Sequence, residues 1–193
     1  MMRRPSGSAF RILVLLTVAV VLSASYVGLV DLTVAHQPVA TVVGWTDTNF
    51  SGKWTLAATG GATGYISVAN GTLTVGSSGR VAPGGTLSAQ NFNIPSLNLY
   101  QYPVLMVTVR SLSVYLAVRI ELWTTATTAW PLVLSTFDDQ SWHTIYVDLP
   151  FLGLTGKLQP HLLELGWMGI QQPVGPNEYV QFENLSLVRL VGS

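Results

Sequence analysis

The pattern of apolar and polar positions divides the chain into a short basic segment, a long apolar run and a region of strand-like alternation. Residues 1–11 carry three arginines, residues 12–30 carry no charge, and the first charge after them is Asp31. About 19 such residues in a helix span roughly 28 Å, close to the hydrocarbon thickness of a bilayer. We therefore expect a cytoplasmic tail at 1–11, a transmembrane anchor at 12–30 and a linker at 31–38.

The charge asymmetry predicts which side of the membrane the rest of the chain occupies. Positive charge before the apolar run places the N-terminus in the cytoplasm and residues 39–193 outside. The alternative is a cleavable secretory signal, with small residues at Ser23-Ala24-Ser25 or Thr33-Val34-Ala35 as cleavage sites. We expect a single-pass membrane protein, or a secreted one if the signal is cleaved, with an extracytoplasmic domain in both cases.

From Val39 onward the alternation is that of β-strands. The clearest case is Val114–Trp123, where every second residue is aliphatic and the residues between are mostly polar or aromatic. The same reasoning predicts strands at 39–45, 54–57, 65–68, 72–75, 86–93, 104–110, 131–135, 142–149, 162–170 and 179–190. Many short strands separated by turn residues, without a sustained helical period, predict an all-β sandwich.

Composition changes this picture in two respects. Lysine and arginine total 9, aspartate and glutamate total 9, and only 9% of residues are charged. A basic surface is absent, so nucleic acid is not an expected partner. The chain has no cysteine, which excludes disulfides, thiol chemistry and cysteine-ligated metals and leaves the core alone to stabilise an exported domain.

Three N-glycosylation sequons occur, at Asn49, Asn70 and Asn184. Asn70 precedes Gly71, and Asn-Gly is typical of an exposed hairpin turn. We therefore expect modification at Asn70 first, and expect Asn184 to lie close to a buried strand.

Three parts of the chain together resemble the galactose-binding-like jelly rolls, the β-sandwich shared by many carbohydrate-binding modules. The first is NFSGKW at 49–54 with VANGTLTV at 68–75, the second is SWHTIYVDL at 141–149, and the third is YVQFENLSLV at 179–188. The resemblance covers roughly residues 42–190 and implies a jelly-roll sandwich. Because fold does not imply function, the function depends on the residues of the site.

In sugar-binding members of such families, aromatic rings stack on the C–H faces of sugars and nearby polar groups bond the hydroxyls. By alternation, Tyr115, Arg119, Glu121 and Trp123 share one outward face, and Trp130 lies in the loop that follows. This group is the candidate glycan platform. The alternative is that these aromatics pack against the other sheet, the linker or a partner protein.

The other tryptophans considered, Trp54, Trp142 and Trp167, are expected in the core. The resemblance also implies a structural calcium ion, for which Asp47 and Glu183 are the candidate ligands. Calcium takes several oxygen ligands, so a hydrogen-bonded or solvated role for Glu183 is the alternative. No other cofactor is expected.

No catalytic constellation stands out. His36, His143 and His161 do not pair at metal-ligand spacing. Asp138-Asp139 is the adjacent acidic pair, and it lies in a predicted turn, where aspartate bonds the backbone. Because no nucleophile or phosphate-binding motif is present, we expect a protein that is not an enzyme.

Two functions remain. The anchor, the sparse charge and the apolar composition favour an accessory or structural subunit of a cell-surface or membrane assembly, with protein partners. The alternative is a surface module that binds glycan through the aromatic platform.

Overall fold

The computed structural model describes residues 41–137 and 139–191. They belong to one compact unit, Gln37–Ser193. The predicted tail, anchor and linker, Asp138 of the acidic pair and His36 lie outside the described residues. Within the described residues, no helix is long and apolar enough to cross a membrane.

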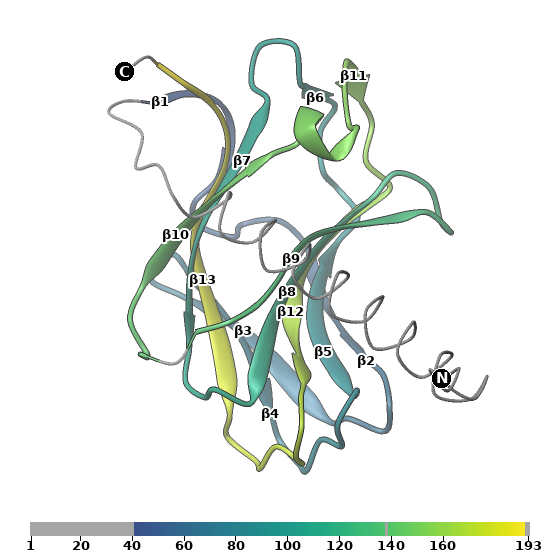
Figure 1. The fold of residues 1–193 in the computed structure, drawn as a ribbon, viewed down its shortest axis with the longest axis vertical. Helices are drawn as coiled ribbons and strands as arrows, with labels where there is room; N and C mark the ends of the chain where they lie inside the picture. The colour runs from purple at the N-terminus through teal and green to yellow at the C-terminus, as the bar shows by residue number, and fades with distance from the viewer. Residues whose placement is uncertain (1–40, 138, 192–193) are drawn as a thin grey trace, which may run out of the picture. The chain divides into compact units, whose positions relative to one another are not determined.

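The described chain forms two antiparallel sheets that face each other (Figure 1). The first sheet has the order β10 (His143–Asp148), β7 (Val104–Ser111), β13 (Tyr179–Leu190), β4 (Thr72–Ser77) and β3 (Gly64–Ala69), and β1 (Thr41–Asp47) also pairs with β13. The second has the order β2 (Trp54–Ala58), β5 (Thr86–Asn91), β12 (Leu162–Gly169), β8 (Leu116–Trp123) and β9 (Ala129–Thr136). The predicted all-β sandwich is confirmed.

Two shorter features lie at one end of the sandwich (Figure 1). Strands β6 (Leu97–Asn98) and β11 (Lys157–Leu158) pair with each other as a two-stranded sheet, which the sequence did not predict. A 3-10 turn at Pro150–Leu152 follows β10, and Gly153 ends it at a φ of 86°. That left-handed conformation is one that glycine adopts without steric cost.

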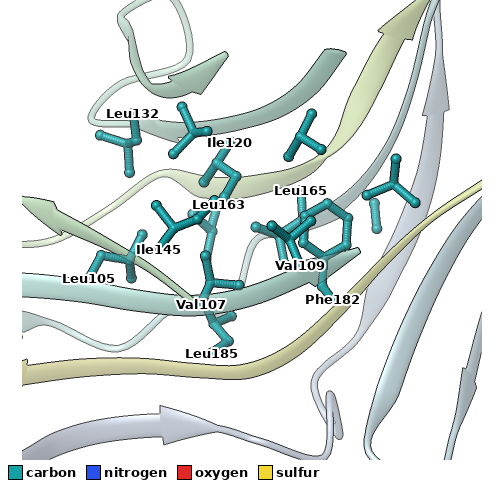
Figure 2. Close-up of a cluster of buried hydrophobic side chains, with 14 of the residues drawn as sticks. Leu105, Val107, Val109, Ile120, Leu132, Ile145, Leu163, Leu165, Phe182 and Leu185 are labelled. Atoms are coloured by element: carbon teal, nitrogen blue, oxygen red, sulfur yellow. The ribbon is translucent and has the colours of Figure 1, made fainter. Parts of the chain in front are cut away.

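The core lies between the sheets and is made of the inward-facing residues of both. Figure 2 shows this layer, where Val107 and Val109 of β7 face Ile120, Leu163 and Leu165 of the second sheet. Each of these five side chains is at most 1% exposed. Burial of aliphatic side chains at roughly 25 cal/mol per Å² is the main stabilising contribution in such a layer.

Trp167 of β12 adds a polar contact between the sheets. Its side chain is 0% exposed, and its indole N–H donates to the carbonyl oxygen of Val75 in β4 at 2.9 Å. A buried indole N–H needs such an acceptor. The expectation that Trp167 lies in the core is confirmed, and Trp54 packs against the core while partly buried.

Trp142 does not lie in the core as expected. It precedes β10, its side chain is 37% exposed, and the Arg110 guanidinium lies over its ring, 4.9 Å from the centroid. The strand begins one residue later, at His143. The ring is therefore covered on one face by a cation instead of by apolar side chains.

The predicted strand 114–123 begins later than expected. The Ser113 carbonyl accepts the Leu116 N–H at 3.2 Å, and the Ser113 hydroxyl accepts the Tyr115 N–H at 3.2 Å. This serine turn takes Val114 out of the strand and leaves it 42% exposed, although the alternation placed it on the inward face. Local side-chain bonds to the backbone compete here with the sheet.

Trp167→Phe should lower the free energy of unfolding by about 2–4 kcal/mol, because it removes a buried hydrogen bond and leaves a cavity. Urea unfolding followed by far-UV circular dichroism measures this. The matched variant Trp142→Phe, at an exposed position, should change stability by less than about 0.5 kcal/mol. Equal effects at the two positions would contradict the assigned role of Trp167.

Candidate functional site

A charged cluster lies on the outer face of the second sheet, the face opposite the core. Glu164 of β12 pairs in register with Gln90 of β5 on one side and Glu121 of β8 on the other. Arg119 lies two residues before Glu121 and so shares its face. Three strands from distant parts of the chain thus bring these four side chains together, and we call them the Arg119 cluster.

Hydrogen bonds join all four members. The Arg119 guanidinium donates to both carboxylate oxygens of Glu121, from Nε at 2.8 Å and from Nη2 at 2.6 Å. Its Nη1 donates to Glu164 Oε1 at 2.9 Å, and Gln90 Nε2 donates to Glu164 Oε2 at 3.1 Å. The single guanidinium of Arg119 therefore binds two carboxylates, and its contact with Glu121 is bidentate.

The cluster is largely shielded from solvent. Glu164 is 4% exposed and Glu121 is 8% exposed. Carboxylates at this depth need charged or hydrogen-bonding partners, and Arg119 supplies them. With one positive and two negative side chains, the cluster has an excess of acceptors.

Gly166 permits this arrangement. It lies in β12, paired with Arg119 on one side and Ser88 on the other. A Cβ atom there would lie 2.2 Å from the Leu87 carbonyl oxygen and 2.6 Å from Ser88 Cα. Because these are backbone atoms of β5, only glycine allows β5 and β12 to come this close.

Trp123 lies on the same face, two residues beyond Glu121 at the end of β8. Its indole nitrogen is buried and has no hydrogen-bond partner among the described residues. The adjacent chain is fixed by the His161 N–H, which donates to the Trp123 carbonyl at 2.7 Å. An unpaired buried donor is costly.

The structure separates the other two aromatics of the predicted platform from Trp123. Tyr115 is 41% exposed and lies in the turn before β8, at the opposite end of that strand. Trp130 is within β9, not in a loop, and pairs with Leu122, a core residue. Because paired residues share a face, Trp130 packs against the core.

The sequence pointed to Arg119, Glu121 and Trp123 but not to Gln90 and Glu164, the other two members of the Arg119 cluster. Glu164 did carry a signal, since it is the charged residue within the apolar run LLELGW. Gln90 gave no such signal, because a glutamine is ordinary in a strand in which about half of the residues are polar. Only the register of β5 against β12 brings it to the cluster.

The two predicted calcium ligands are engaged in other contacts. Asp47 accepts the Ser51 N–H at 3.0 Å and the Trp54 indole N–H at 3.3 Å. Glu183 accepts the Thr72 hydroxyl at 2.6 Å. No group of three or more histidine, aspartate or glutamate side chains placed to hold a metal occurs in the part of the chain that the structure describes. The calcium site stays a prediction.

Asp139 has the backbone role expected of a turn residue. Its carboxylate lies 2.7 Å from His143 Nε2 and accepts the Ser141 N–H at 3.0 Å. These hydrogen bonds, first that to His143, lower the pKa of the Asp139 carboxyl. The carboxylate therefore stabilises the turn.

The three sequon asparagines are all exposed. Asn70 occupies the β3–β4 hairpin turn with a φ of 51°, as its sequence predicts. Asn184 lies in β13 yet is exposed, because it too has a positive φ, 53°, at an irregularity in the pairing with β7. Modification of these residues stays a prediction.

No family model and no curated protein matches the chain. Solved structures do match. The family 11 carbohydrate-binding module from Clostridium thermocellum, in complex with a β-1,3-1,4-mixed-linked tetrasaccharide, aligns with a TM-score of 0.52 and 13% identity over 77% of this chain and 96% of the module.

Two further matches are weaker. The family 11 module of a cellulosomal cellulase of Clostridium thermocellum has a TM-score of 0.48 and 13% identity over 81% of this chain and 97% of that one. A family 29 carbohydrate-binding module has a TM-score of 0.47 and 12% identity over 77% and 88%.

The domain has the jelly-roll fold of the family 11 module. At 13% identity the likeness establishes the fold and leaves the ligand to be argued from the site. The jelly roll implied by the sequence motifs is thereby confirmed.

Arg119→Met should destabilise the domain by about 2–4 kcal/mol, because Glu121 and Glu164 would stay buried without their counter-charge. Chemical unfolding of the two proteins measures the difference. Arg189→Met is the matched control, since Arg189 is exposed on β13, and should change stability by less than about 0.5 kcal/mol. An unchanged Arg119→Met midpoint would show that the cluster is not held as described.

Proposed function

We propose that the domain is a non-catalytic carbohydrate-binding module whose ligand lies on the outer face of the second sheet, over the Arg119 cluster and Trp123. The proposal rests on the Arg119 cluster, whose largely buried side chains are all joined by hydrogen bonds. The fold does not require charged residues on this outer face of the second sheet. The jelly-roll fold shared with the family 11 module supports it.

The chemistry of the cluster favours a neutral polyhydroxylated ligand. One positive and two negative side chains repel phosphate and carboxylate groups, whereas sugar hydroxyls donate to the remaining lone pairs of Glu121 and Glu164. Carboxylates, guanidinium and a side-chain amide in one row offer both acceptors and donors, which a sugar with vicinal hydroxyls uses together.

Trp123 provides the apolar part of the site. Its half-buried ring offers a face for the C–H side of a sugar. A site that combines one aromatic with several convergent polar groups is typical of small-ligand recognition.

The assembly-subunit hypothesis, which the sequence favoured, has no support among the structural matches. The matches are binding modules, so the glycan-binding alternative is the function proposed. Display of the module outside the cell, on a membrane anchor, is part of the proposal and follows from the apolar run at 12–30.

Binding is tested by titration calorimetry of the full chain with the β-1,3-1,4-mixed-linked tetrasaccharide and with a panel of neutral β-glucan, xylan and mannan oligosaccharides. At least one neutral oligosaccharide should bind, and Trp123→Ala should weaken it about tenfold or more through loss of stacking. Gln90→Ala, which leaves the charge pairs intact, should weaken it about three- to tenfold.

Trp142→Ala is the matched control, because Trp142 is also an accessible tryptophan but precedes β10 of the other sheet. It should bind as the unaltered chain does. Absence of binding across the panel, or equal binding by Trp123→Ala, would refute the proposed site.

A further inference from the structure

The first sheet carries a groove on its own outer face, on the opposite side of the sandwich from the Arg119 cluster. It has a volume of about 590 Å³ and runs across β1, β7, β10 and β13. This volume lies within the roughly 300–1,000 Å³ of typical small-ligand sites. Its lining includes Thr48, Met106, Tyr146, Asn184 and Ser186.

The floor of the groove is formed by the paired row Thr46, Ser186, Met106 and Tyr146. Ser186 is 2% exposed, and its hydroxyl lies 3.0 Å from the hydroxyl of Thr46. The floor is thus fixed by a hydrogen bond between β1 and β13, as well as by the sheet itself.

A β-bulge in β13 forms one wall. The pairing of β13 with β7 shifts between Glu183 and Ser186, and Asn184 within the shift has a φ of 53°. Asparagine tolerates this left-handed conformation better than most residues. The bulge turns Asn184 outward to line the groove, and bulges commonly re-aim a side chain in this way.

The lining is free of charge. Met106 and the Tyr146 ring provide apolar surface, while Thr48, Tyr146 and Asn184 provide a hydroxyl, a phenol and an amide. Within the described residues, these three polar groups have no side-chain hydrogen bonds, whereas Thr108 and Thr144, farther along the groove, lie within bonding distance of each other at 3.2 Å. Burial raises the pKa of Tyr146, and its phenol hydroxyl can both donate and accept.

We propose that this groove binds a neutral saccharide, at a site separate from that on the second sheet. An uncharged lining offers no counter-charge to a phosphate or carboxylate, whereas apolar surface beside unpaired hydroxyl and amide groups matches the C–H faces and hydroxyls of a sugar. Because it uses other residues, the site goes beyond the proposed function and does not depend on it.

The saccharide has two sources. It is either a free glycan or a glycan linked to Asn184 itself, because Asn184-Leu185-Ser186 is a sequon and the amide faces the groove. Both sources present the same chemistry to Tyr146, and the experiment separates them.

For the free source, the full chain is produced in a host without N-glycosylation and titrated with N,N′-diacetylchitobiose and with the mixed-linked tetrasaccharide, using NMR shifts. Tyr146→Phe removes only the phenol hydroxyl, and Asn184→Gly removes the amide at a φ that glycine adopts freely. Each should weaken groove binding at least fivefold. Trp123→Ala, in the other site, should leave it unchanged.

For the attached source, the full chain is produced in a secretory host with N-glycosylation. Intact mass should show that the unaltered chain carries a glycan that Asn184→Gly lacks. An amidase that removes N-glycans should release the Asn184 glycan at least fivefold faster from Tyr146→Phe than from the unaltered chain. The groove is refuted if neither probe binds and Asn184 is unmodified. It is equally refuted if Tyr146→Phe and Asn184→Gly bind both probes as the unaltered chain does and the glycan leaves Tyr146→Phe no faster than it leaves the unaltered chain.

Discussion

The apolar layer between the two sheets fixes everything that the outer faces present. The chain has no cysteine, so no disulfide fixes the relative position of the sheets, and side-chain packing has to do so. Trp167 joins this layer to the backbone of the opposite sheet through Val75. Once the inward residues are set, the pleat forces their neighbours outward, and the Arg119 cluster and the groove floor formed by Thr46, Ser186, Met106 and Tyr146 occupy those outward positions.

The Arg119 cluster is not explained by stability. A buried ion pair gains little over apolar residues of the same shape, because both charges lose their hydration. Apolar side chains on this face would expose a patch of the kind that promotes association. A connected row of donors and acceptors instead keeps the face polar while holding each side chain in one geometry. Such preorganisation lowers the entropy lost when a ligand binds.

Two features of the strands explain why Tyr115 and Trp130 do not lie beside Trp123 as predicted. Tyr115 lies in the Ser113 turn before β8, at the far end of the strand from Trp123, because a shared face along one extended strand does not bring distant positions together. In β9 a register shift opposite Ile120 and Glu121 determines the face on which Trp130 lies, and it packs against the core. Alternation assumes an unbroken strand, and a one-residue irregularity transfers a side chain to the other face.

The sequence alone determined the sandwich, the positions of most strands and the shared face of Arg119, Glu121 and Trp123, because a period of two is a local property of one strand. The tertiary structure decided which strands are neighbours. It therefore placed Gln90 and Glu164 beside Arg119, since pairing between segments more than 40 residues apart depends on the register of the whole sheet, which neither segment specifies alone.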